Sequence, residues 1–240
     1  MEKQSPDFET VMKELASLGK ERTKKSYMSR GAKEPLFGVA TGAMKPLSKK
    51  IGINQPLAEA LYATGNYDAM YFAGIIADPN GMSEADYDRW MDDAYFFMIS
   101  DYIVAVTLSE SDSAQKVADR WIRSREDLRM SAGYSCYCWL LGNRKDSEFN
   151  KEKLLSMMRQ VQETIHEAPV NAKKAMGEFL YTIALSYLPL HEEAMKIAEE
   201  LGEIDLIKEE KKTKTIHPIA TIQKELDRGR LGFKRKYVRC

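Results

Sequence analysis

Apolar residues recur along most of this chain at steps of three and four, the spacing of one face of a helix. In the segment 6–20 the apolar residues from Phe8 to Leu18 share one such face, and Gly19 follows the last of them. The same pattern appears in the stretches 55–64, 67–77, 83–99, 114–124, 126–142, 150–166, 171–188, 190–202 and 221–229. Because few segments alternate as strands do, the pattern predicts an all-α protein.

Turn and cap signals separate these short helices. Ser83 with Asp86 forms a capping-box pattern directly after the turn sequence DPNG, which predicts a helix start there. Small residues stand where paired helices could touch, at Ala40, Ala43, Gly74, Ala118, Ala132, Gly133, Ala175 and Gly177. Such pairs would bury their faces only against neighbours, which favours a helical solenoid and leaves a compact bundle as the alternative.

The charges cancel overall but are unevenly placed. The segment 66–112 has ten acidic residues and one basic residue, whereas 208–240 has eleven basic and four acidic residues. We therefore expect a helical-repeat domain over 1–207, followed over 208–240 by a charged linker, a short helix and a basic C-terminal arm. The run KEEKKTK at 208–214 has no apolar face and predicts a solvated loop.

Cysteines and histidines suggest no metal site. Cys136, Cys138 and Cys240 form no even set, and the first two would point about 200° apart on a helix. We expect no metal and no cofactor. No apolar stretch has the length of a membrane span and no secretory leader precedes the first helix, so we expect a cytoplasmic protein without membrane contact.

Five segments, taken in order, resemble the DNA alkylation repair family. They are FGVATGAMKPLSKKIG, YDAMYFAGIIAD, FFMISDYIVAVTLSES, VADRWIRSREDLRMSAGYSCYCWL and NAKKAMGEFLYTIA, within roughly residues 30–205. The resemblance implies an α-α superhelix of the HEAT- or ARM-like repeat class, with a concave basic surface for duplex DNA. It also implies metal-free removal of N3- and N7-alkylated purines by cleavage of the N-glycosidic bond.

That reaction places positive charge on the deoxyribose as the cationic base leaves. A carboxylate stabilises the developing charge, and tryptophans cradle the base and sugar. Active members of the family have a Trp-Asp-x-x-Asp-like helix start for this purpose. Here the corresponding residues are Ser100, Asp101 and Val104, the family arginine falls near Ser131, and the second tryptophan falls near Glu178. The family's catalytic set is therefore absent, which leaves open whether this protein is an enzyme.

Two carboxylates remain candidates for catalysis. Ser100 or Asp101 is most simply a helix cap in front of an apolar run. Alternatively, Asp101 replaces the lost acid from one helical turn away, or Glu178 supplies negative charge from a neighbouring helix.

Basic and aromatic residues are candidates for DNA contact, because arginine forks pair with phosphate oxygens. The candidates are Lys45, Lys49, Trp121, Arg123, Arg125, Arg129, Lys173, Lys174, Arg235 and Lys236. For the arginines of 120–129 the alternative is pairing with Asp119, Glu126 and Asp127, and for the tryptophans it is core packing. The basic arm either binds DNA or folds back on the acidic segment 66–112.

Three functions follow from these patterns. The first is a DNA-binding HEAT-like repeat protein, related to DNA alkylation repair enzymes, with weak or absent glycosylase chemistry. The second is an active glycosylase that excises alkylated purines, and the third is a scaffold for protein interactions. The expected partner is DNA, whether duplex, alkylated or branched.

Overall fold

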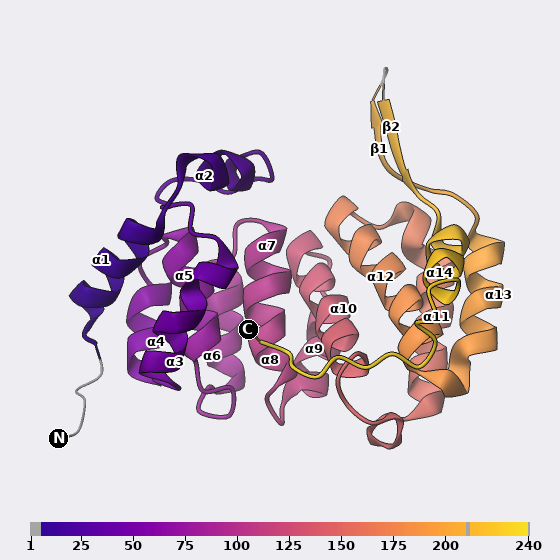
Figure 1. The fold of residues 1–240 in the computed structure, drawn as a ribbon. Coiled ribbons are helices and arrows are strands. Elements are labelled where there is room, and N and C mark those ends of the chain that lie inside the picture. Colours follow the sequence, from indigo (N-terminus) through magenta and orange to yellow (C-terminus); the bar gives the residue numbers. More distant parts are fainter. Residues whose placement is uncertain (1–5, 210–211, 240) are drawn as a thin grey trace. The chain divides into compact units, whose positions relative to one another are not determined.

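The computed structural model describes residues 6–209 and 212–239, without the side chains of 207–213. The described chain forms two compact units (Figure 1). Unit 1 contains the residues up to Ser113 together with Arg239, and unit 2 contains Ala114–Val238. The chain therefore leaves unit 1 once and returns to it near its C-terminus.

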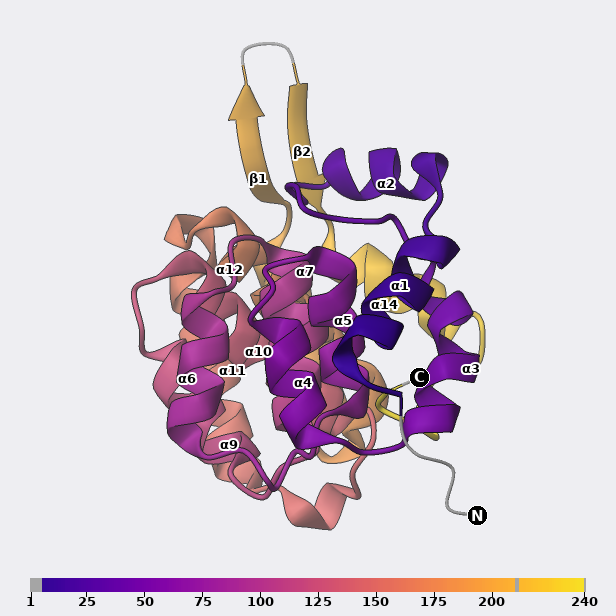
Figure 2. The ribbon, with the colours of Figure 1, turned by 90° about the vertical axis from the view of Figure 1, so that its left-hand side faces the viewer.

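Unit 1 consists of short helices (Figure 2). In chain order these are α1 (Phe8–Leu18), α2 (Glu21–Met28), the 3-10 helix η1 (Thr41–Met44), α3 (Lys45–Ile51), α4 (Gln55–Tyr62), α5 (Tyr67–Ile76), α6 (Glu84–Asp92), α7 (Phe97–Ile99), the π-helix η2 (Ser100–Val104) and α8 (Ala105–Ser109). The predicted end of α1 at Gly19 and the capping box of Ser83 and Asp86 are confirmed.

One predicted helix of unit 1 is wrong. The pattern over 83–99 predicted a single helix, but α6 ends at Asp92 and α7 begins at Phe97. Phe96 between them is extended, and its ring lies 5.4 Å from that of Tyr67 and 5.0 Å from that of Tyr95. Burial of this aromatic ring outweighs the continuity of the apolar helix pattern.

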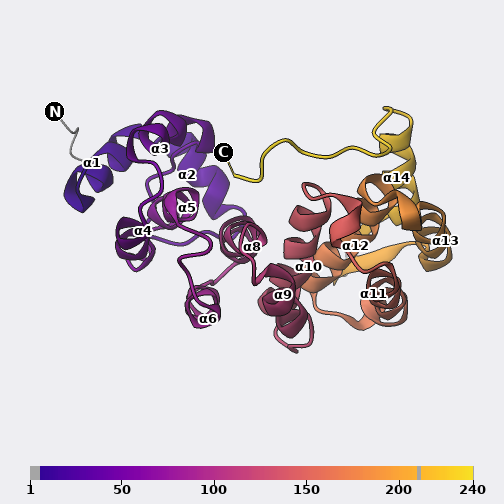
Figure 3. The ribbon, with the colours of Figure 1, turned by 90° about the horizontal axis from the view of Figure 1, so that it is seen from below.

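Unit 2 contains longer helices and a hairpin (Figure 3). Its elements are α9 (Ala114–Ile122), α10 (Asp127–Leu141), η3 (Asp146–Glu148), α11 (Lys151–Thr164), η4 (Ile165–Glu167), α12 (Val170–Ser186), η5 (Leu188–Leu190), α13 (His191–Leu201), β1 (Ile204–Glu209), β2 (Lys212–Ile216) and α14 (Pro218–Leu226). Helix α10 packs between α9 and α12, and α12 also packs against α13 and α14. The fold of unit 2 is therefore organised around α12.

Small residues permit the closest helix contacts, as predicted. A Cβ atom at Gly133 of α10 would lie 2.7 Å from Cγ1 of Ile122 and 2.8 Å from the carbonyl oxygen of Ala118 in α9. In unit 1 a Cβ atom at Gly74 of α5 would lie 2.8 Å from Cγ2 of Ile103. All three distances are shorter than real Cβ contacts, so a side chain at either position would displace its neighbour.

The hairpin of unit 2 corrects the expectation of a solvated loop over 208–214. Strands β1 and β2 pair antiparallel from Ile204 opposite Ile216 to Glu209 opposite Lys212, and extend away from the helices (Figures 1 and 2). The alternation of lysine with β-branched threonine in 212–216 suits a strand. Ile204 is buried at its base, so the hairpin is rooted in the core.

Helices otherwise form the regular structure of the described chain, which confirms the all-α prediction. Across the described part of the chain, no helix has the length and apolar character needed to cross a membrane.

A buried carboxylate joins the loop before η1 to helix α5. Asp68 is fully buried, and its carboxylate accepts hydrogen bonds from the backbone N–H groups of Phe37, Gly38 and Val39, the last two at 2.8 Å. Gly38 has a φ of +80°, and a Cβ atom there would lie 2.5 Å from the backbone nitrogen of Lys24. One acid therefore fixes the path of this loop.

Replacement of Asp68 by alanine tests this role. Asp68→Ala leaves three buried N–H groups without an acceptor, so we expect the free energy of unfolding to fall by roughly 3–5 kcal/mol. Urea denaturation followed by circular dichroism measures the loss. The control Asp112→Ala removes an exposed acid of the same unit and should cost less than about 0.5 kcal/mol. Equal stability of the two variants would contradict the role assigned to Asp68.

Candidate nucleic-acid interface

The stretch that resembles the family's catalytic helix start is a π-helix. Helix α7 begins at Phe97, and the backbone N–H of Ala105 donates to the carbonyl oxygen of Ser100 within η2. The N-cap residues here are Phe96 for α7 and Ile99 for η2, so the interpretation of Ser100 or Asp101 as the cap at a helix start is wrong. One extra residue in the turn lets the helical run continue through this segment.

The carboxylate in this segment has little access to solvent. Asp101 is 8% exposed, and its Oδ1 accepts a 2.7 Å hydrogen bond from the hydroxyl of Ser100. Val104, at the place of the family's catalytic acid, is fully buried. The described geometry therefore presents no exposed carboxylate at either position.

The other two family positions lie in unit 2. Ser131 is buried, and its hydroxyl donates to the carbonyl oxygen of Asn171 at 3.3 Å. Glu178 projects from α12 with part of its side chain exposed. Crowding by protein atoms raises the pKa of its carboxyl, although the charge of Arg235 acts in the opposite direction.

Most aromatic candidates are core residues. Trp90 and Trp121 are 0% and 1% exposed, and Tyr134 and Tyr137 are likewise buried. The alternative of core packing is therefore confirmed for these four, and Trp121 has almost no surface to offer to DNA. Trp139 is half-buried and differs from them, because the guanidinium of Arg235 lies 4.4 Å from its ring centre.

The acids near the arginine group mostly have other partners. Asp119 accepts hydrogen bonds of 2.6 Å from both Tyr137 and Lys153. Asp127 accepts the backbone N–H of Ala172 at 2.8 Å and so holds the start of α12. Both carboxylates therefore have hydrogen-bond partners outside the arginine group.

The three arginines of this group that are candidates for DNA contact differ. Arg129 pairs with Glu126 at 2.8 Å, as the local-pairing alternative predicted. Arg123 and Arg125 are exposed and, within the described part of the chain, form no ion pair. Phosphate contact stays a prediction for these two.

The candidate lysines lie on different elements. Lys45 and Lys49 are exposed on α3 of unit 1. In unit 2, Lys173 donates to the carbonyl oxygen of Asp205 at 3.1 Å, and Lys174 is half-buried on α12.

The basic C-terminal arm is docked on unit 2. Lys234 Nζ donates to Asp146 at 2.8 Å and to the carbonyl oxygen of Leu141 at 2.7 Å. The backbone N–H of Arg235 donates to the carbonyl oxygen of Gly142 at 2.6 Å. Backbone hydrogen bonds and an ion pair therefore hold this part of the arm against the end of α10. Lys236, the last predicted contact, is exposed.

The end of the arm belongs to unit 1. Arg239 Nη1 donates to the carbonyl oxygens of Gly74 at 2.8 Å and Ala77 at 2.9 Å, at the C-terminus of α5. Its guanidinium also pairs with Glu110, a member of the acidic segment 66–112. The alternative that the arm folds back on this segment holds at Arg239.

A cationic surface surrounds Tyr181, which the sequence analysis did not identify. Three adjacent pockets of unit 2, of about 120, 430 and 190 Å³, share this residue. Their charged residues are Lys174, Glu178, Lys224, Glu225, Arg230 and Arg235. We call this the Tyr181 surface. Four cations face two acids here, so the surface attracts anions. Across 6–209 and 212–239, no three side chains of histidine, cysteine, aspartate or glutamate lie together as metal ligands would.

Comparison with known proteins identifies the family of this chain and two relatives. The family model described as DNA alkylation repair enzyme matches residues 9–215. An uncharacterized protein of Listeria innocua is 24% identical over 227 residues, covering 92% of this chain and 98% of that protein. Another, of Listeria monocytogenes, is 25% identical over 203 residues, covering 82% and 87% respectively.

A solved structure is more similar. It is 65% identical to this chain with a TM-score of 0.95, and the match covers 98% of this chain and 100% of that one. It is described as "a new family of proteins related to the HEAT-like repeat DNA glycosylases with affinity for branched DNA structures". The predicted HEAT-like repeat class of the fold is therefore confirmed.

The anchoring of Arg239 can be tested by its removal. Arg239→Ala leaves Glu110 without its cation and the end of α5 without a donor, so we expect the free energy of unfolding to fall by about 2–4 kcal/mol. Arg239→Lys should recover only part of the loss, because one ammonium group cannot replace a planar fork. Urea denaturation compares both with Lys236→Ala, which changes an exposed cation of the same arm. A loss no larger than that of the control would show that the anchor is unimportant.

Proposed function

Because this chain belongs to the DNA alkylation repair enzyme family, we propose that it binds branched DNA and does not excise alkylated bases. The observation that supports this most is the 65% identity, over 98% of the chain, to a protein from a family described as having affinity for branched DNA structures.

Local surface charge supports binding to DNA, although the whole chain is neutral. Unit 1 presents Lys45 and Lys49, and unit 2 presents Arg123 and Arg125 together with the Tyr181 surface. Cations of this kind neutralise phosphates and release counterions, whatever the base sequence. Contacts to the backbone suit recognition of a DNA shape, which is what distinguishes a branch from a linear duplex.

The buried carboxylates support the absence of excision. Stabilising an oxocarbenium ion requires a charged carboxylate within reach of the deoxyribose. Asp101 is bonded to Ser100 and nearly buried, and Val104 has no charge to offer. A DNA partner and the buried, reduced thiols of Cys136 and Cys138 fit the cytoplasm expected from the sequence.

Salt-dependent binding tests the proposal. We expect a four-way junction to bind at least about ten-fold more tightly than a linear duplex of equal length in a gel-shift assay. Between 50 and 200 mM salt, affinity should fall by about 10³-fold if six phosphates are contacted. A DNA affinity that does not change with salt would speak against phosphate contacts and favour the scaffold for protein interactions. No binding of the junction at 50 mM salt would reject the proposal.

A base-release assay tests the second part of the proposal, that the protein does not excise alkylated bases. Incubated with methylated duplex DNA, the purified protein should release no more 3-methyladenine or 7-methylguanine than a protein-free control, because Asp101 is buried and Val104 stands at the place of the family's catalytic acid. The matched variant Asp101→Asn should give the same background. Release by the native protein that disappears in Asp101→Asn would establish the glycosylase alternative.

A further inference from the structure

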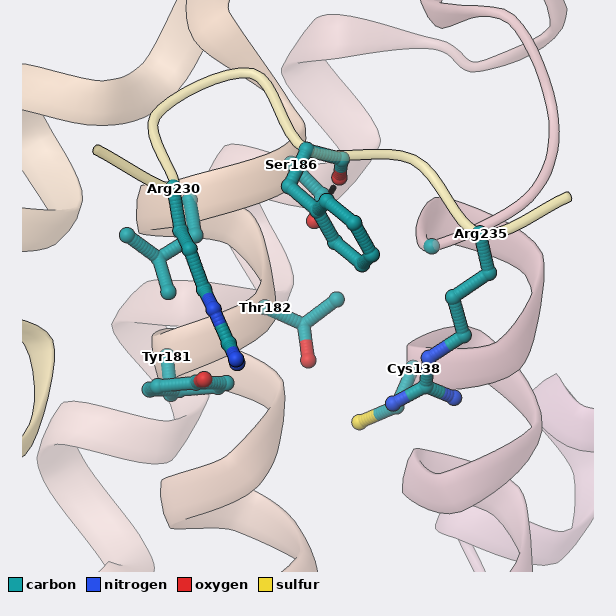
Figure 4. A pocket seen from close by; sticks show the side chains of 9 residues that line it. Cys138, Tyr181, Thr182, Ser186, Arg230 and Arg235 are labelled. Atoms are coloured by element: carbon teal, nitrogen blue, oxygen red, sulfur yellow. Dashed lines mark hydrogen bonds between the residues drawn. The ribbon is translucent and has the colours of Figure 1, made fainter. Parts of the chain in front are cut away.

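One pocket of the Tyr181 surface lies where the C-terminal arm crosses α10 and α12 (Figure 4). Arg230 and Arg235 reach into it from the arm on two sides, while Tyr181 and Thr182 face it from α12. The pocket has a volume of about 120 Å³ and lies entirely within unit 2.

We infer that this pocket binds a single phosphate group of a DNA strand, with Arg230 and Arg235 as its main ligands. The inference rests on the proposed function and specifies where the backbone of the DNA is held.

Arg235 is held in place but has unused hydrogen-bond donors. Its guanidinium stacks 4.4 Å from the ring centre of Trp139, and its backbone N–H is bonded to Gly142. Within residues 6–209 and 212–239, this guanidinium has no hydrogen bond and no ion pair. Stacking fixes the plane of the group and leaves its N–H edge for an anion, the arrangement used in phosphate recognition.

Arg230 is only partly neutralised. Its Nη1 lies 2.8 Å from Oε2 of Glu225, but that oxygen has no aligned hydrogen-bond donor. Glu225 also accepts a 2.6 Å hydrogen bond from Arg228. Since one carboxylate is shared by two arginines, positive charge remains at the mouth of the pocket.

The hydroxyl groups that line the pocket have distinct roles. Thr182 donates to the carbonyl oxygen of Glu178 at 2.7 Å, and Ser186 donates to that of Phe233 at 2.9 Å, so neither offers a proton to a ligand. Burial, followed by the charges of Glu225 and Glu178, raises the pKa of Tyr181, which therefore keeps its proton. The two arginines and Tyr181 are the donors available to an anion.

The size of the pocket limits what it can hold. A cavity needs about 10–15 Å³ of such volume to hold one water, so 120 Å³ is room for a group of several atoms. Sites for whole organic ligands usually measure about 300–1,000 Å³. The size of this pocket therefore suits a phosphate group better than a whole nucleoside.

Substitution of Arg235 tests the site with the full-length protein. Fluorescence anisotropy with a labelled four-way junction, at several salt concentrations, gives both affinity and its salt dependence. We expect Arg235→Ala to weaken binding about ten-fold and to reduce the slope of log K against log salt by about one. Arg235→Lys should weaken binding less than Arg235→Ala does, because lysine keeps the charge but not the stacked guanidinium fork.

The control is Arg159→Ala, which removes an exposed arginine of α11 in the same unit and should leave affinity and slope unchanged. Thermal unfolding followed by circular dichroism checks that each variant unfolds at the same temperature as the native protein. If the native protein binds the junction and Arg235→Ala binds equally well, the inference is overturned while the proposed function stands.

A second measurement separates the two possible failures. Inorganic phosphate is titrated against the ¹⁵N-labelled protein, and the Nε–H resonance of Arg235, assigned with Arg235→Lys, is followed by NMR. Movement with phosphate but not with chloride at equal ionic strength supports the site; no movement overturns it. If the resonance moves but the native protein binds no DNA, a free phosphate is the ligand, and both the DNA assignment and the proposed function fail.

Discussion

Close approach of neighbouring helices is the constraint on which both units depend. At Gly133 and Gly74 the partner helix stands where a side chain would have to go, so the backbones pack directly against one another. Helices this close bury their apolar faces in each other without a separate core, which is how a repeat protein is stabilised. In unit 2 the same packing sets α10 beside α12, and these two helices form the floor on which the C-terminal arm rests.

Helices with one apolar face could be located from sequence, and elements without such a face could not. Helix α1 and its end at Gly19 follow from spacing alone. Helix α2 has no buried residue, so it left no periodic signal. The strand 212–216 is lysine alternating with threonine and isoleucine, which reads as a charged run unless a pairing partner is known. Such elements form because of the residues they contact in the folded protein, and these contacts cannot be read from the local sequence pattern.

The candidate site could likewise be predicted only in part. Family resemblance placed Ser100, Val104 and Glu178 at the family's catalytic positions, and the family match bears out the resemblance. It could not show that one extra residue in the turn buries Asp101. Nor could the resemblance predict that Arg235 stacks on Trp139, because these residues are far apart along the chain and come into contact only where the arm packs on unit 2.

The arm also connects the proposed absence of one activity with the proposed presence of another. Base excision requires a cavity that admits a whole nucleoside and an acid beside it. On α12, the family position of a base-holding tryptophan is Glu178, and one turn later Tyr181 borders a pocket of about 120 Å³ that residues of the arm line. The arm thus places Arg230 and Arg235, which suit the sugar-phosphate backbone, beside the helix on which the family carries its second tryptophan. A protein that holds phosphates without extruding a base responds to the path of the strands, and that path is what changes at a branch point.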